Sequence, residues 1–139
     1  MEIREFRSED ATALVEILRA NQQYGHPDID GPEAMEKVRQ CSAAEFLVAV
    51  SGGEAVGFVR GTFDGSRAVI YLASVHPSHK RQGIGAALVR EIARRFKARG
   101  ALSLAVIVPG DAGFWKAMHF RQTTRVMQAY PIDEVFAPQ

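Results

Sequence analysis

The 139-residue chain has little of several features that define other classes of protein. Cys41 is the only cysteine, which excludes an intramolecular disulfide and a cysteine-based metal cluster. No apolar run approaches the about 20 residues of a membrane-spanning helix, and the opening MEIREFRSED has no secretion-signal pattern. No group of His, Asp and Glu has metal-ligand spacing. We therefore expect a cytoplasmic protein that needs neither metal nor membrane, with Cys41 as a structural packing residue.

An excess of charge of one sign is also missing, because the formal net charge is +1. The 47% apolar content suits one core, and we expect a single domain over residues 1–139. Basic side chains nevertheless gather around one predicted helix, opposed there by Glu91 alone. They are Lys80, Arg81, Arg90, Arg94, Arg95, Lys97 and Arg99. A solvated helix face that steers anions is favoured over nucleic-acid binding, since no aromatic platform accompanies these charges.

The first forty residues predict a strand followed by two helices. Ile3 and Phe6 belong to a short opening strand, and apolar residues at helical spacing follow Ser8, a suitable N-cap. Residues 21–30 are polar and turn-rich, which indicates a flexible loop facing a substrate. Pro32 then begins a helix that reaches about Gln40.

The rest of the chain predicts an α+β domain with a mixed sheet. Hairpin-connected strands are expected at 45–50, 55–62 and 68–75. The other expected elements are an amphipathic helix at 84–98, a buried strand at 102–108, a short helix at 112–118 after a break at 109–111, and one or two closing strands within 120–130. The long helix must cross over between two parallel strands, which makes the sheet mixed.

The most informative segment joins the strand at 68–75 to the helix at 84–98. Gly83 and Gly85 let the main chain approach a ligand, and the N–H groups at the start of a helix attract a phosphate or pyrophosphate. Glycines at such a turn also occur for backbone geometry alone, but Lys80 and Arg81 favour an anion site. The turn lacks the P-loop pattern and the third glycine of a dinucleotide fingerprint.

The segment Lys80-Arg81-Gln82-Gly83-Ile84-Gly85 resembles the signature Gln/Arg-x-x-Gly-x-Gly/Ala of the GNAT superfamily of acetyl-CoA-dependent N-acetyltransferases. Similarity extends to the I-R-x-F opening, the strand end LASVHP and the segment FWKAMHF, and is greatest to small bacterial members of unassigned substrate. The resemblance implies the GNAT-like acyl-CoA N-acyltransferase fold, in which two central parallel strands, here 68–75 and 101–108, splay apart.

The resemblance also implies acetyl-CoA as co-substrate and assigns residues to it. The backbone of one group would hold the pyrophosphate: Arg81, Gln82, Gly83, Ile84, Gly85 and Ala86. Ala73, Ser74 and Val75 would line the pantetheine arm, whose thioester carbonyl would lie near a polarising N–H.

Departures from the family pattern cluster near the thiolate end of the cofactor. Lys80 replaces the usual Gln or Arg, Trp115 stands where many members have a proton-donating tyrosine, and His119 replaces a glycine. An asparagine often found after the last central strand is missing from 108–111. His119, Ser74, Tyr71 or a water then remain as proton donors, although His119 also fits a turn or a packed surface and Trp115 fits packing or acceptor contact. Strand alternation would place Tyr71 and Ser74 on different faces.

The leading hypothesis is direct transfer of an acetyl group to a primary amine in a ternary complex. The alternative is a CoA-binding regulatory or interaction module with little transferase activity. A polyamine, an antibiotic, an amino acid and a protein N-terminus all remain open as acceptors, and Tyr24, His26, Asp28 and Asp30 either line the acceptor pocket or are simply solvated. Apolar residues between 126 and 136 either close the sheet or contact a second subunit, which leaves a homodimer open.

Overall fold

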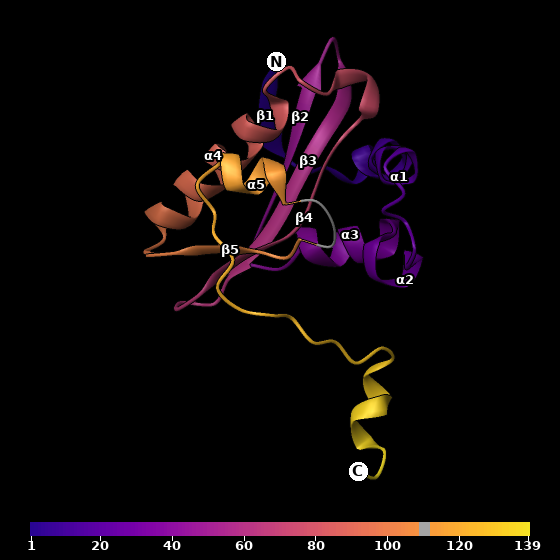
Figure 1. Cartoon of the computed structure of the whole chain (residues 1–139). Coiled ribbons are helices and arrows are strands. Elements are labelled where there is room, and N and C mark those ends of the chain that lie inside the picture. Colours follow the sequence, from indigo (N-terminus) through magenta and orange to yellow (C-terminus); the bar gives the residue numbers. More distant parts are fainter. Residues whose placement is uncertain (109–111) are drawn as a thin grey trace. The chain divides into compact units, whose positions relative to one another are not determined.

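The computed structural model describes residues 1–108 and 112–139, which form two compact units, Met1–Ile107 and Val108–Gln139 (Figure 1). The first unit contains a sheet whose strands are β1 (Glu2–Glu5), β2 (Ala44–Ser51), β3 (Glu54–Phe63), β4 (Ala68–Val75) and β5 (Leu104–Val106). Its helices are η1 (Ser8–Asp10), α1 (Ala11–Ala20), α2 (Pro27–Asp30), α3 (Pro32–Arg39), η2 (Pro77–His79) and α4 (Ile84–Ala98). The second unit contains α5 (Gly113–Ala117) and η3 (Ile132–Phe136).

The sheet has the order β1-β2-β3-β4-β5, which places the strands in sequence order. All neighbours are antiparallel except β4 and β5, which α4 connects and which run parallel. This confirms the predicted α+β class, its mixed sheet and the crossover at 84–98. The strand predicted at 102–108 is shorter, and it pairs with β4 only at residues 68–70.

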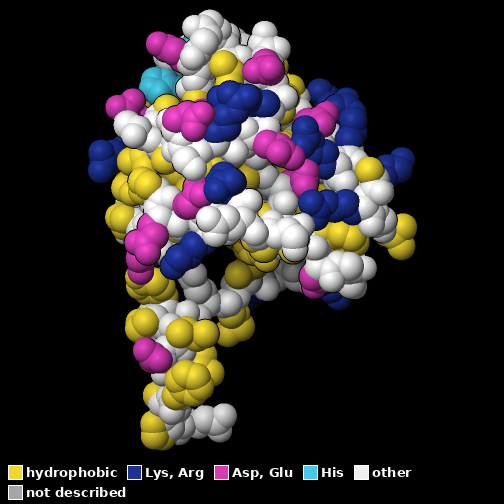
Figure 2. All heavy atoms as spheres, turned by 180° about the vertical axis from the view of Figure 1, so that it is seen from behind, with side chains coloured by type: hydrophobic (Ala, Val, Ile, Leu, Met, Phe, Trp, Pro, Cys, Tyr) yellow, Lys and Arg dark blue, Asp and Glu magenta, His cyan; other side chains and the backbone are white. Residues whose placement is uncertain are grey.

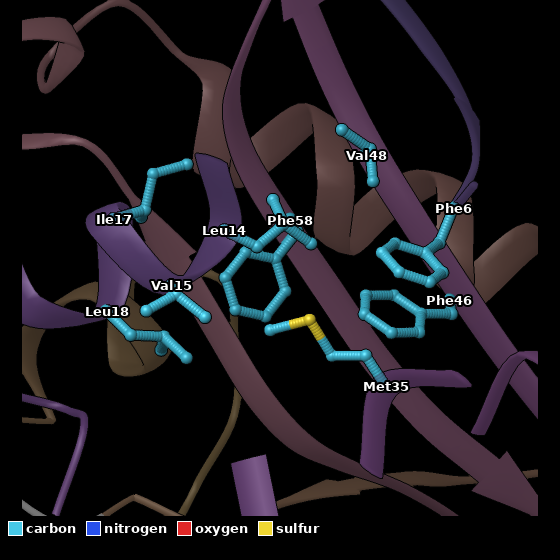
Figure 3. Close-up of a cluster of buried hydrophobic side chains, with 9 residues drawn as sticks. All are labelled: Phe6, Leu14, Val15, Ile17, Leu18, Met35, Phe46, Val48 and Phe58. Carbon is cyan, nitrogen blue, oxygen red and sulfur yellow. The ribbon is translucent and has the colours of Figure 1, made fainter. Parts of the chain in front are cut away.

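One face of the sheet packs against α1 and α3 through a cluster of buried apolar side chains (Figure 3). Phe6 stacks on Phe46 with ring centroids 4.3 Å apart, and Phe46 lies 6.0 Å from Phe58. The other members are Leu14, Val15, Ile17, Leu18, Met35 and Val48. The alternation of β2 sends Leu47 and Ala49, both fully buried, to the opposite face.

The opposite face is covered by α4, whose apolar stripe follows the predicted four-residue spacing. Its buried residues are Ile84, Leu88, Val89, Ile92 and Phe96. The sheet is therefore a layer between two layers of helix (Figure 1), and α4 begins on this face with the buried residue Ile84.

Residues 21–30, predicted as a flexible loop, are anchored at both ends. Asn21 and Gln23 bond to β4, and the Asp30 carboxylate accepts a 2.6 Å hydrogen bond from Arg60 on β3. The last four residues form α2, which the sequence prediction missed. Pro27 at the first helical position explains the short helix, since proline needs no hydrogen bond there. Cys41 is exposed, so its predicted packing role is wrong.

The second unit has less regular structure than the sequence predicted. The helix expected at 112–118 is present as α5, but residues 120–130 contain no strand, and the prediction of closing strands is wrong. β propensity depends on a neighbouring strand and on packing, and residues 121–139 are all exposed. The predicted break at Pro109-Gly110-Asp111 lies outside the described residues. Among the described residues, no helix combines the length and the apolar character that crossing a membrane requires.

Candidate active site

The turn before α4 has the backbone geometry of an anion site. Gly83 is the N-cap residue of α4 in the left-handed conformation, with φ +79°, and Arg81 two residues earlier has φ +65°. A Cβ on Gly83 would meet nothing within 4 Å, so the space beside this glycine is open. The N–H groups of Ile84, Gly85 and Ala86 stand in the first turn, where a helix offers donors without helical acceptors.

Hydrogen bonds between neighbouring residues fix the path from β4 into this turn. The Ser78 N–H donates to His76 Nδ1 at 3.1 Å, and the His79 N–H donates to the His76 carbonyl at 2.9 Å. Lys80, Arg81 and Gln82 follow as exposed side chains. The sequence-predicted pyrophosphate residues are thus brought together on one exposed turn, whose donors and positive charges suit a phosphate.

The basic residues farther along α4 are largely engaged in ion pairs. Glu91 binds Arg94 at 3.1 Å and Arg95 at 3.0 Å, and Glu45 binds Arg99 at 2.7 Å. On the face shown in Figure 2, Lys and Arg side chains are interspersed with Asp and Glu side chains. The helix therefore presents less net positive charge than its own sequence indicates.

The C-terminal half of β4 has a strand neighbour on one side only among the described residues. β5 pairs with β4 at Ala68, Val69 and Ile70 and goes no further. The His76 N–H donates to the Val56 carbonyl of β3 at 2.8 Å. In an antiparallel pair the backbone groups of successive residues point alternately toward the neighbouring strand and away from it. The N–H and C=O groups of Ala73 and Val75 therefore point away from β3, toward the β5 side of β4. The end of β5 thus leaves a stretch of β4 backbone for another partner, as the predicted splaying of these strands requires.

Two carboxamides that the sequence analysis did not single out reach this stretch. Asn21 Nδ2 donates to Ser74 Oγ and to the Val75 carbonyl, both at 2.8 Å. The Ser74 hydroxyl donates to Gln23 Oε1 at 2.6 Å, and Gln23 Nε2 approaches the Ala73 carbonyl at 3.5 Å. We call Asn21, Gln23 and Ser74 the amide clamp. No sequence signal marks it, because Ser74 lies about fifty residues from the two carboxamides in the chain.

The three candidate proton donors occupy different surroundings. Ser74 is only 6% exposed and both roles of its hydroxyl are used by the clamp, whereas Tyr71 is 44% exposed at a register shift between β3 and β4. His119 lies in the second unit, exposed, with φ +71°. That left-handed conformation explains why relatives are expected to carry glycine there.

Trp115 lies in a small aromatic group of the second unit. Its ring meets Phe114 and Phe120 edge to face, with centroids 5.0 and 5.3 Å away. These contacts match the packing interpretation of this residue.

A pocket of about 590 Å³ lies beside the segment that precedes the turn. Its lining includes Arg7, Glu16, His76 and His79, and it includes none of the predicted pyrophosphate residues. The described residues hold no group of three or more His, Cys, Asp or Glu side chains placed to bind a metal ion. The donors that fit a phosphorylated ligand are therefore those of the glycine turn.

A family model, curated relatives and solved structures were compared with this chain. Residues 11–120 match the model of the acetyltransferase (GNAT) family. An acetyltransferase of Photorhabdus laumondii is 33% identical over 111 residues, which cover 80% of this chain and 77% of that protein. The PaiA N-acetyltransferase of Thermoplasma acidophilum, solved with coenzyme A, has a TM-score of 0.74 at 18% identity and 85% coverage of each chain. An aminoglycoside N-acetyltransferase solved with CoA has a TM-score of 0.74 at 19% identity and 94% coverage of each.

Proposed function

This chain belongs to the acetyltransferase (GNAT) family, and we propose that it transfers the acetyl group of acetyl-CoA to a primary amine by direct attack within a ternary complex. The observation that carries the proposal is the pairing of two features in the first unit. An exposed glycine turn with left-handed Gly83 begins α4, and the half of β4 that leads to it lacks a strand neighbour toward β5 among the described residues.

The residues present fit acetyl-CoA. The backbone of residues 81–86 would hold the pyrophosphate, where Gly83 leaves open space, and Ala73, Ser74 and Val75 would line the arm. Bound acetyl-CoA supplies a thioester that an amine can attack. The N–H groups directed to the free edge of β4 would polarise its carbonyl, and no metal is needed for this.

A proton path completes the proposal. A water or a nearby side chain would take the proton from the attacking amine, and the departing thiolate needs a donor. Tyr71 is exposed on β4, whereas the Ser74 hydroxyl already donates to Gln23. We therefore propose Tyr71 or a water as the proton donor to the thiolate ahead of Ser74. His119 is the other candidate.

The alternative is a CoA-binding regulatory or interaction module. Trp115 supports it, because an indole packed between Phe114 and Phe120 provides no proton donor of practical strength where many relatives have tyrosine. Saturable CoA binding with no turnover over a wide panel of amines would favour this alternative.

The acceptor is proposed only as an amine. The solved relative named above acts on aminoglycosides by its name, which makes such antibiotics one part of the panel, beside polyamines, amino acids and peptide N-termini.

We also propose that both units form one domain, because the family model spans residues 11–120 and so includes parts of each. We also propose a cytoplasmic location without nucleic-acid or membrane partners, while a homodimer stays open.

Calorimetric titration of acetyl-CoA into the wild type and a Gly83→Glu/Gly85→Glu variant tests the site. Two carboxylates beside a pyrophosphate should weaken binding by at least about 100-fold. The matched control is Gly52→Glu/Gly65→Glu, which adds the same charge at two glycines with open space around them, both at positive φ. Equal weakening in the control, or a wild type that binds no acetyl-CoA, would contradict the proposed function.

A further inference from the structure

We propose that Asn21 and Gln23 are positioning residues, whose carboxamides hold the part of β4 beyond Ile70 in the conformation that receives the pantetheine arm. We call this part the free half of β4, because among the described residues no strand pairs with its β5 side. The inference rests on the proposed function and extends it to residues outside the glycine turn. It assigns to the segment after α1 a role in binding the cofactor, in addition to any contact with the acceptor.

The hydrogen bonds of the clamp join the end of α1 to the predicted arm-lining residues. Asn21 is the C-cap residue of α1, and its two 2.8 Å bonds end on Ser74 Oγ and the Val75 carbonyl. Gln23 accepts from Ser74 Oγ at 2.6 Å and approaches the Ala73 carbonyl at 3.5 Å. All three residues expected to line the arm are therefore contacted by side chains from this one segment.

Burial fixes the orientation of these groups. Ser74 is 6% exposed, and among the described residues every buried side-chain nitrogen or oxygen has a hydrogen-bond partner. Its hydroxyl has a single proton, which goes to Gln23 Oε1, so it must act as acceptor toward Asn21 Nδ2. Reversing either carboxamide would break a short bond in a buried site, and the clamp has one favoured arrangement.

The clamp takes the place of a strand neighbour. Beyond Ile70 no described strand pairs with the β5 side of β4, and the carbonyls of Ala73 and Val75 point to that side. The clamp donors occupy these carbonyls, while the N–H groups of the same two residues also point outward and suit the carbonyl oxygens of the arm. The long Gln23 contact is the one that an amide N–H of the arm would replace most easily.

Loss of the clamp should therefore affect the arm and spare the phosphates. Without side-chain donors, the free half of β4 has to be ordered when the arm binds, and that ordering reduces affinity. The phosphate turn depends on Gly83 and the first turn of α4, whereas the hydrogen bonds of the clamp end on β4. This difference separates a positioning role from general damage to the fold.

The test compares two ligands by calorimetry: coenzyme A, and adenosine 3′-phosphate 5′-diphosphate, which is coenzyme A without its arm. Asn21→Asp keeps the shape of the side chain but removes both 2.8 Å donations. We expect it to bind coenzyme A about 10-fold more weakly. The affinity for the arm-free nucleotide should change by less than about twofold. Gln22→Glu is the matched control, because it makes the same carboxamide-to-carboxylate exchange at an exposed residue between the two clamp carboxamides.

A second variant covers the case in which Asn21→Asp does not fold. Gln23→Glu retains the acceptor for Ser74 and removes the 3.5 Å donation to the Ala73 carbonyl. It should therefore lower the affinity for coenzyme A about twofold to threefold. Unchanged coenzyme A affinity in the clamp variants, or an equal loss for both ligands, overturns the inference and leaves the proposed function intact. A wild type that does not bind coenzyme A overturns both.

Discussion

Asp10 and Ser74, the two buried polar side chains among the described residues, are satisfied in different ways. The Asp10 carboxylate forms two bonds with the Arg4 guanidinium, at 2.8 and 2.9 Å, and accepts a 2.8 Å bond from the Arg7 N–H. All its partners lie within six residues. Ser74 is neutral, and its side-chain partners come from a segment about fifty residues earlier.

The two arrangements separate a region that serves stability from one that serves ligand binding in this unit. A buried charge is tolerated only with a fixed counter-ion, so the Asp10 corner is a rigid structural joint between β1 and α1. The clamp holds a strand edge by neutral bonds, and the longest of them, from Gln23, is one that a ligand can replace at modest free-energy cost. Three changes are expected to affect the two regions differently.

The largest effect is expected for Asp10→Ala. It leaves the Arg4 guanidinium, whose side chain is 19% exposed, without its main partner, and should lower the free energy of unfolding by about 3 kcal/mol. Denaturant titration measures this, with Glu9→Ala, an exposed neighbour, expected to stay within about 0.5 kcal/mol. Coenzyme A affinity of the folded fraction should be unchanged. A loss below about 1 kcal/mol would show that the corner is not a structural joint.

An intermediate effect is expected in acid. Burial raises the pKa of the Asp10 carboxyl, but the hydrogen bonds from Arg4 and from the Arg7 N–H outweigh it and hold the pKa below its ordinary value. Such a group binds fewer protons in the folded chain than in the unfolded chain, so its stabilising contribution is complete above about pH 4 and is lost at lower pH.

Unfolding titrations between about pH 6 and pH 2 can isolate this contribution. The stability gap between wild type and Asp10→Asn should shrink as pH falls below about 4. Glu36, whose pKa Arg39 and Ser8 lower to about 2, titrates in both proteins and cancels in the difference. A gap that stays constant over this range would contradict the role of the Asp10 charge.

The smallest effect is expected for Ser74→Ala. It removes the hydroxyl that accepts from Asn21 and donates to Gln23, but Asn21 keeps its hydrogen bond to the Val75 carbonyl. The substitution should therefore lower the free energy of unfolding by about 1 kcal/mol. The loss should be independent of pH between 7 and 3. Denaturant titration measures both, with exposed Ser103→Ala as control. A loss as large as that of Asp10→Ala would remove the contrast between the regions.

Local patterns predicted much of the first unit. The four-residue spacing of α4, the turn at Gly52 and Gly53, and the parallel pairing around α4 were all predicted, because each follows from neighbouring residues or from a chain-connection rule. Strands expected within 120–130 are not present, since a strand depends on the neighbour that pairs with it. The loop expected at 21–30 is anchored at both ends. Its hydrogen-bond partners lie on β3 and β4, which are distant in the chain, so the local sequence does not predict them.

The sequence by itself determined the glycine turn, the crossover helix and membership of the acetyltransferase family, because these depend on residue types at short spacing along the chain. Packing in three dimensions was needed to show that Ser74 is enclosed by two carboxamides, that the Asp10 ion pair is buried and that Cys41 is exposed. The Ser74 hydrogen bonds join segments about fifty residues apart, and burial depends on which elements pack over a side chain, so no spacing within one segment encodes either.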